Sequence, residues 1–353
     1  MAAERTPAVI LGAAGYVGAE LLRLIALHPR FELAHAVSES KPGSSIAAAF
    51  PHLAPSHGDA CFSSVSAAQA VLERGAQVAL FSALPHGESA PRILEWMKLA
   101  EERGAELRIV DISADLRLGD PALHAKVYGK PHPAPELLER AVCALPELVR
   151  GVPSKLIAHP GCFTTAVTLA CRPLQALGLS AGPYFASAIT GSTGSGREPV
   201  AATHHPWRHG NMRAYSPFAH RHEPEMQRLI GADGPKPEVL FVPTSGPFAR
   251  GIHATVHVTL REPMTGAALR EQLKAFWSGM PFIRVEDAPP ALKDVVGTNC
   301  CRITAEARGC EAVIISVIDN LTKGAAGGAV QWMNRLFEVP DTTGLLIPGP
   351  GWN

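Results

Sequence analysis

Apolar and polar stretches alternate in a regular order over the first 112 residues. Amphipathic stretches that predict helices lie at 19–27, 66–74 and 90–103. Short apolar runs, typical of buried strands, precede or follow them at 7–11, 31–37, 77–83 and 106–112. Because strands alternate with helices, this part of the chain predicts an α/β domain with a parallel, doubly wound sheet.

The pattern changes beyond residue 156. Further strand-like runs, several of them alternating, lie at 184–190, 238–242, 253–260 and 311–318. Runs of strands with few helices predict an α+β domain with an antiparallel or mixed sheet. Proline-rich passages mark the boundary, and the last helix, 325–337, has no strand partner left there, so it returns to the first domain. We therefore predict one domain over 1–155 plus 322–353 and a second over 156–321.

Three glycines follow the first predicted strand. Gly12, Gly15 and Gly18 stand between that strand and an amphipathic helix. Such a unit needs glycine where the chain turns, where backbone approaches a pyrophosphate, and where helix packs on strand. The flanking strand and helix favour a dinucleotide-binding Rossmann unit over a turn without function. The polar residues after two later strands, at 84–87 and 113–117, fall at strand ends where such sheets bind ligands.

One cysteine, Cys162, follows a Pro-Gly turn directly ahead of an apolar, helix-like run. A helix beginning near Phe163 would point its unpaired N–H groups and positive dipole end at the sulfur, which favours a thiolate nucleophile. The simpler alternative is a small apolar residue at a helix start.

Composition predicts a globular enzyme. The chain has 353 residues, 46% of them hydrophobic, with 32 basic and 32 acidic side chains, so no net field attracts nucleic acid or membrane and an anionic substrate must meet local arginines. No stretch resembles a signal peptide or membrane span, and seven cysteines without regular spacing predict a reducing, cytoplasmic location. We expect no metal site, because Cys300 and Cys301 lack a partner pair and the histidine-rich passage 203–217 is typical of a polar surface loop.

Nine segments in chain order carry a resemblance that covers nearly the whole chain. The sequence resembles the N-acetyl-γ-glutamyl-phosphate reductase family, within the aspartate-semialdehyde-dehydrogenase-like superfamily. That family reduces an acyl phosphate to an aldehyde with NADPH, in arginine biosynthesis. The segments are 12–18, 84–87, 115–118, 145–148, 159–163, 191–197, 220–225, 250–252 and 318–327.

The resemblance assigns roles to individual residues. It implies that Cys162 is the nucleophile and that His220, His222 or both supply acid–base catalysis. It implies substrate contacts from Arg117, Glu225 and Arg250, and a homo-oligomer, dimer or tetramer, built through the sheet of the second domain. The implied NADP-binding residues are Gly12, Gly15, Tyr16, Val17, Gly18, Ser38, Ser40, Lys41, Pro85, His86, Ser192, Gly194, Gly196 and Asn320.

The chemistry of the residues agrees with those roles. A thioester accepts a hydride more readily than an acyl phosphate does, so Cys162 attacks first, phosphate leaves, and a histidine assists collapse of the later thiohemiacetal. His222 stands three residues before Glu225, which could orient its ring in a helical turn, while His220 has no such partner. Either ring could face the cysteine. The simpler alternative is that the pair merely caps the helix after Pro224 and takes no part in catalysis.

Two features depart from the family pattern. Thr164 and Cys171 replace smaller or aliphatic residues in the helix after the cysteine, without consequence for the chemistry. Glu39 stands where the family carries the arginine that binds the 2′-phosphate of NADP, and it lies 21 residues after Gly18, where an acidic residue binds the ribose of NAD. The resemblance favours NADP, with Ser38, Ser40 and Lys41 around the phosphate, and the local rule favours NAD.

Two alternatives share most of these features. A reductase of aminoadipyl or aspartyl phosphate would use the same mechanism with a different pocket. A non-enzymatic redox sensor would bind the dinucleotide without needing the cysteine, the arginine and the paired histidines together.

Overall fold

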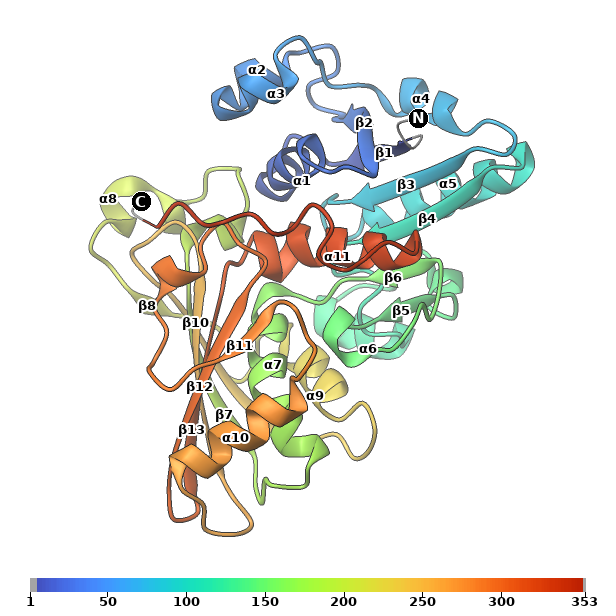
Figure 1. Cartoon of the computed structure of the whole chain (residues 1–353). Helices are drawn as coiled ribbons and strands as arrows, with labels where there is room; N and C mark the ends of the chain where they lie inside the picture. The colour runs from blue at the N-terminus through green and yellow to red at the C-terminus, as the bar shows by residue number, and fades with distance from the viewer. Residues whose placement is uncertain (1–4, 352–353) are drawn as a thin grey trace. The chain divides into compact units, whose positions relative to one another are not determined.

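The computed structural model describes residues 5–351, which form two compact units (Figure 1). Of the described residues, the N-terminal unit comprises 5–160 and 325–346, and the C-terminal unit comprises 161–324 and 347–351. Within the described residues, no helix combines the length and the apolar character needed to cross a membrane.

The N-terminal unit is built on a six-stranded parallel sheet, which confirms the predicted α/β fold. The strand order is β2-β1-β3-β4-β6-β5, so the connections from β1 leave in opposite directions on its two sides. In such sheets the crevice at the carboxyl ends of the strands at this reversal binds the ligand. The strands are β1 (Thr6–Leu11), β2 (Phe31–Val37), β3 (Gln77–Ser82), β4 (Glu106–Asp111), β5 (Ala141–Cys143) and β6 (Leu156–Ala158).

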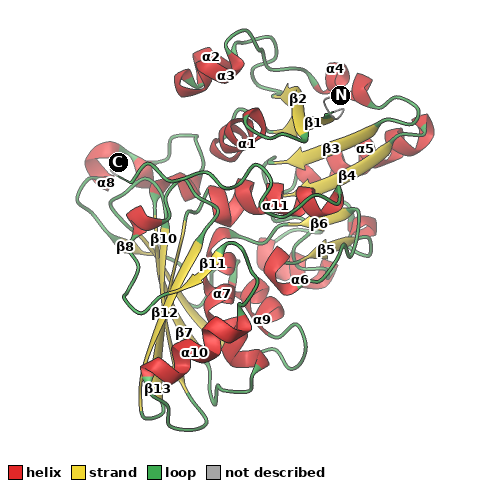
Figure 2. Ribbon diagram, in the orientation of Figure 1, coloured by secondary structure: helices red, strands yellow, loops and turns green. Residues whose placement is uncertain are grey.

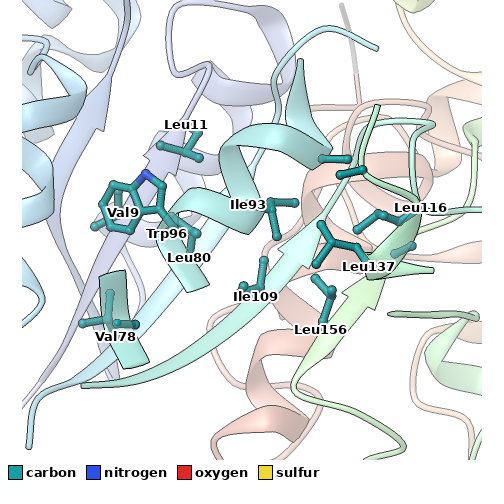
Figure 3. Packing of buried hydrophobic residues seen from close by; sticks show 14 of the residues in the cluster. Val9, Leu11, Val78, Leu80, Ile93, Trp96, Ile109, Leu116, Leu137 and Leu156 are labelled. Atoms are coloured by element: carbon teal, nitrogen blue, oxygen red, sulfur yellow. The ribbon is translucent and has the colours of Figure 1, made fainter. Parts of the chain in front are cut away.

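The core of this unit lies between the sheet and helix α5 (Ser89–Arg103). Ile93 and Trp96, one turn apart on α5, are fully buried against strands β1, β3 and β4 (Figure 3). The strands read as continuous apolar runs because both faces of a parallel sheet are covered. The other helices are α1 (Tyr16–Ala26), α2 (Ile46–Ala49), α3 (Ala54–His57), α4 (Val65–Ala68), α6 (Pro121–Tyr128) and α11 (Gly327–Leu336).

Several predicted boundaries are wrong for identifiable reasons. Helix α1 begins at Tyr16 rather than at residue 19, because Gly18 belongs to the helix and packs so closely that a Cβ there would lie 2.5 Å from the Cα of Ala13. The helix predicted at 66–74 is only α4 and one 3-10 turn, Gln69–Val71. Strands β5 and β6 have three residues each, too few to produce a detectable pattern.

The C-terminal unit holds a seven-stranded mixed sheet, which confirms the second predicted architecture. Its order is β11-β12-β13-β10-β7-β9-β8, with β7–β9 and β11–β12 parallel and the other pairs antiparallel. Along β10, Ile252, Ala254, Val256 and Val258 are buried, as the alternation predicts. The strands are β7 (Tyr184–Thr190), β8 (Arg213–Ala214), β9 (Val239–Ser245), β10 (Ile252–Thr259), β11 (Ile283–Val285), β12 (Cys301–Arg308) and β13 (Glu311–Ile318).

Helices α7 (Cys162–Ala176), α9 (Glu223–Ile230) and α10 (Gly266–Phe276) pack on one face of this sheet (Figure 2). The long passage between β7 and β9 contains the short helix α8 (His205–Arg208). Helix α11 belongs to the N-terminal unit, which confirms the predicted return of the C-terminal helix.

Candidate active site

A pocket of about 450 Å³ opens in the C-terminal unit beside the carboxyl ends of β7 and β9. Thr190 and Ser245, the last residues of these paired strands, both line it. The pocket joins the N-terminus of α7 to the passage between β7 and β9. Its chemically active lining residues are Cys162, Tyr215, His220, His222, Arg208, Arg213 and Arg221.

Cys162 is the first residue of α7, one position earlier than predicted. Gly161 is the N-cap residue in extended conformation, with φ −63° and ψ 154°, and its carbonyl accepts the N–H of Thr165 at 2.8 Å. The half-buried sulfur therefore lies at the positive end of a 15-residue helix that has no acidic residue in its first turn. That setting stabilises a thiolate and a developing oxyanion.

The His222 imidazole packs directly on the cysteine turn. A Cβ added to Gly161 would lie 2.4 Å from Nε2 of His222, and the side chain is 6% exposed. His222 is also the N-cap residue of α9, so the start of that helix fixes where the ring lies. Of the two predicted histidines, this ring contacts the residue that precedes the sulfur.

His220 lies next to His222 in a cluster of aromatic rings. Its ring meets those of Phe163, Tyr215, His222 and Phe241 edge to face, with centroids 4.6–5.6 Å apart. Its Nδ1 accepts the backbone N–H of His222 at 3.2 Å. Burial, helped by the nearby positive charge of Arg221, lowers the pKa of His220 to about 4. The ring is therefore neutral at physiological pH, which suits the acceptor role of Nδ1.

Glu225 braces the same turn from α9. Its Oε2 accepts the N–H of Gly161 and the hydroxyl of Thr164, each at 2.9 Å. The side chains of Glu225 and Thr164 are both buried. The carboxylate thus ties α9 to the first turn of α7. Thr164, which departs from the family pattern, supplies a hydrogen bond that an alanine or valine there would lack.

The pocket is also lined by three arginines that the sequence alone did not indicate. Arg208 and Arg213 come from the passage predicted as a polar surface loop, and Arg221 stands between the two histidines. Arg208 donates to the hydroxyl of Ser245 and to the carbonyl of Phe248. The loop is largely exposed, as predicted, but it also forms one wall of the pocket.

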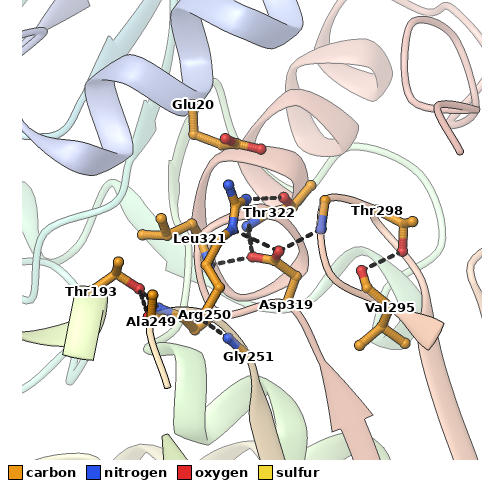
Figure 4. Close-up of polar contacts among 12 residues, drawn as sticks. Glu20, Thr193, Ala249, Arg250, Gly251, Val295, Thr298, Asp319, Leu321 and Thr322 are labelled. Atoms are coloured by element: carbon orange, nitrogen blue, oxygen red, sulfur yellow. Dashed lines mark hydrogen bonds and ion pairs between the residues drawn. The ribbon is translucent and has the colours of Figure 1, made fainter. Parts of the chain in front are cut away.

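Arg250 lies in a second polar cluster of the same unit (Figure 4). Its guanidinium contacts the buried carboxylate of Asp319 at 2.8 and 3.2 Å and the hydroxyl of Thr322 at 2.9 Å. Asp319 also accepts the backbone N–H groups of Gly297, Leu321 and Thr322. The ion pair therefore organises the turn after β13, where a Cβ on Gly324 would lie 2.7 Å from that of Cys162.

Arg117 is buried in the N-terminal unit. It donates to the carbonyls of His159 at 2.9 Å and Ile112 at 2.7 Å. The predicted substrate role of Arg117 stays a prediction, as does that of Arg250, and both guanidinium groups hold backbone or carboxylate partners.

The glycine turn after β1 fits a dinucleotide. Gly12 has φ +74°, and a Cβ there would lie 2.5 Å from the carbonyl oxygen of Ala83 at the end of β3. Gly15 is the N-cap residue of α1, whose first turn carries no acidic residue. Backbone N–H groups at that helix start can therefore meet phosphate oxygens without repulsion.

Predicted cofactor residues also occur in both units as parts of loops. His86 accepts the N–H of Ala114 through Nδ1 at 2.9 Å, at the end of β3. In the C-terminal unit, Asn320 accepts from Gly251 at 2.7 Å and donates to Thr193 at 3.0 Å, which fixes the loop with Ser192, Gly194 and Gly196.

Comparison with known proteins shows that both units of the chain match semialdehyde dehydrogenase families. Residues 7–154 match the family described as "Semialdehyde dehydrogenase, NAD binding domain", and residues 162–320 match "Semialdehyde dehydrogenase, dimerisation domain". The fold is that of solved semialdehyde dehydrogenases. One is aspartate semialdehyde dehydrogenase II from Vibrio cholerae, with a TM-score of 0.66 at 17% identity over 95% of this chain and 99% of that one. Another, crystallised with NADP, is from Candida albicans, with a TM-score of 0.62 at 15% identity over 95% of this chain and 99% of that one.

Relatives at higher sequence identity show the particular enzyme family within this class. N-acetyl-γ-glutamyl-phosphate reductase of Symbiobacterium thermophilum is 39% identical over 97% of both chains. The enzyme of the same name from Halorhodospira halophila is 39% identical over 95% of this chain and 96% of its own. The chain belongs to the N-acetyl-γ-glutamyl-phosphate reductase family, and its N-terminal unit is a nicotinamide dinucleotide-binding domain.

Proposed function

We propose that this chain reduces N-acetyl-γ-glutamyl phosphate to N-acetylglutamate semialdehyde with NADPH, through a thioester on Cys162. The observation that carries the proposal is the placement of Cys162 at the start of α7, inside a pocket where His222 packs on the preceding glycine. The 39% identity to reductases of that name supports the choice of substrate.

The first step uses the helix. The Cys162 thiolate attacks the acyl carbon, the carbonyl oxygen becomes an oxyanion near the N–H groups of α7, and the C–O bond to phosphate breaks, leaving a thioester and inorganic phosphate. Arg208, Arg213 and Arg221 carry the positive charges of the pocket and would meet the phosphate and the substrate carboxylate.

The second step uses a histidine. When bound, the nicotinamide supplies a hydride to the thioester carbonyl carbon. We assign His222 as the group that gives a proton to the resulting oxygen and takes it back as the C–S bond breaks, because its ring is beside the cysteine turn. His220, neutral and hydrogen-bonded to the backbone of His222, positions that ring. Glu225 positions the turn itself through Gly161 and Thr164.

The remaining site residues stay proposals. We propose that the glycine turn of Gly12, Gly15 and Gly18 holds the pyrophosphate, and that NADP rather than NAD is the physiological cofactor. The description of residues 162–320 as a dimerisation domain supports a homo-oligomer, which light scattering at several concentrations tests. The predicted cytoplasmic location stays a prediction.

The decisive assay runs the reaction backwards. N-acetylglutamate semialdehyde, phosphate and NADP⁺ should produce NADPH, at a kcat/KM at least about 100-fold above that for aspartate semialdehyde. A factor of that size equals about 2.7 kcal/mol of transition-state discrimination. Faster turnover of aspartate or aminoadipate semialdehyde would assign the chain to a related acyl phosphate. No turnover of any semialdehyde by folded protein would favour the redox-sensor alternative.

A further inference from the structure

We infer that Arg92 binds the 2′-phosphate of NADP in this chain, and that Glu39 holds the guanidinium in place until the phosphate displaces its carboxylate. The inference rests on the proposed use of NADP and names the residue that would select it. It removes the conflict between an acidic residue after β2 and a phosphorylated cofactor.

Glu39 lies where the adenosine ribose of a dinucleotide is bound. The carbonyl of Val37, the last residue of β2, accepts the N–H of Ala13 in the glycine turn at 2.9 Å. Glu39 follows two residues later, beside the phosphate-binding turn. A carboxylate at this place accepts hydrogen bonds from the ribose hydroxyls of NAD and repels a 2′-phosphate, unless a cation neutralises it.

Such a cation is present. The guanidinium of Arg92, on the first turn of α5, donates through Nη2 to Oε1 of Glu39 at 2.5 Å. The Glu39 side chain is 54% exposed and that of Arg92 28% exposed. An ion pair this accessible is weak, so a dianionic phosphate can replace the carboxylate.

A second carboxylate keeps Arg92 in position during that exchange. Nη1 of Arg92 donates to Oε2 of Glu95, one helical turn further along α5, at 2.7 Å. Glu95 is itself held at Oε1 by the amide of Gln69, also at 2.7 Å. When Glu39 turns away, the guanidinium stays anchored through Nη1, and its Nη2 and Nε groups are the donors left for phosphate oxygens.

Hydroxyl groups complete the subsite. Ser38 and Ser40 flank Glu39, and their Oγ atoms lie 3.4 Å apart. Both can donate to a phosphate, as the family resemblance implies for the same two serines. The subsite therefore combines one fixed arginine, two hydroxyl groups and a carboxylate that can leave.

Binding to the cofactor-free protein tests the inference without turnover. Isothermal titration calorimetry would measure NADP⁺ and NAD⁺, and also 2′-AMP and 5′-AMP, against wild type, Arg92→Ala, Glu39→Gln and the double variant. Lys98→Ala removes one cation from the same helix and serves as the control. We expect Arg92→Ala to weaken NADP⁺ and 2′-AMP at least about 10-fold, the loss of one charge-assisted contact, and to change NAD⁺ and 5′-AMP less than about 2-fold.

The carboxylate variant gives the opposite expectation. Glu39→Gln should tighten NADP⁺ several-fold, and the gain should be at least as large in the Arg92→Ala background, where no cation neutralises the carboxylate. Equal weakening of both dinucleotides by Arg92→Ala would make Arg92 a structural residue and overturn the inference. Unchanged NADP⁺ binding would also overturn it. An enzyme that binds NAD⁺ tighter yet still oxidises N-acetylglutamate semialdehyde would refute the inference and the proposed use of NADP, and would leave the proposed substrate and the thioester on Cys162 standing.

Discussion

Gly161→Ala is a steric test of the contact between His222 and the cysteine turn. The backbone accepts alanine, since φ −63° and ψ 154° are open to any residue. The new methyl group would lie 2.4 Å from Nε2 of His222 and 2.5 Å from Cε1, well inside a normal contact of about 3.5 Å. The imidazole must therefore move by about 1 Å.

A shift of that size has a calculable consequence. Displacing a reacting group by 1 Å can lower turnover about 100-fold, whereas overpacking costs about 1–3 kcal/mol of folding free energy. We expect kcat for phosphate-dependent oxidation of N-acetylglutamate semialdehyde to fall about 100-fold while the protein stays folded. Gly182→Ala, in the same unit with no atom within 4 Å of the new Cβ, is the matched control and should keep wild-type kcat.

The double variant separates a local effect from a general one. In a His222→Asn background the ring is gone, so Gly161→Ala should lower kcat only slightly further. A Gly161→Ala variant that keeps more than half of wild-type kcat would refute a catalytic role for the contact between His222 and the cysteine turn. Fold-losses in kcat from Gly161→Ala and His222→Asn that multiply in full in the double variant would refute it as well.

Three further predictions concern stability. Thr164→Val should lower the free energy of unfolding in urea by about 1.5–3 kcal/mol, the value of a buried hydrogen bond to a charged acceptor. Thr168→Val should lower it by less than about 0.5 kcal/mol, because the Thr168 hydroxyl has no hydrogen bond among the described residues. Equal losses would argue against a stabilising contact between Thr164 and Glu225. Because the pKa of His220 is lowered in the folded protein, the unfolded chain binds the proton first as pH falls. Wild type should therefore lose about 3 kcal/mol of unfolding free energy relative to His220→Asn between pH 6.5 and pH 4. Parallel curves of unfolding free energy against pH for the two proteins would contradict this. Asp319→Asn should destabilise the protein by about 3 kcal/mol by breaking the buried pair with Arg250, and an unchanged unfolding midpoint would argue against it.

Local sequence patterns predicted the two architectures because each sheet type imposes its own periodicity. The parallel strands form continuous apolar runs, and β10 of the mixed sheet alternates along its length. The start of α7 was predicted within one residue, because a Pro-Gly turn ahead of an apolar run specifies both the helix and the cysteine at its N-terminus.

Contacts between residues distant in sequence were not predictable. Glu225 lies 64 residues from Gly161, and Glu39 lies 53 from Arg92, so no local pattern relates them. The pairing of Arg250 with Asp319 spans 69 residues and is likewise a property of the tertiary structure. The sequence identified Cys162 and the two histidines, and the fold determined their partners and added the three arginines of the pocket.

A pre-steady-state experiment without phosphate tests the thioester on Cys162 most directly. Mixing the enzyme with N-acetylglutamate semialdehyde and NADP⁺ should release one NADPH per active site in a burst and then stop, because the thioester has no acceptor. Mass spectrometry should place the acyl group on Cys162, and added phosphate should discharge it. Cys162→Ser should show neither burst nor adduct. Steady turnover without a burst, or an adduct on any other residue, would contradict the mechanism.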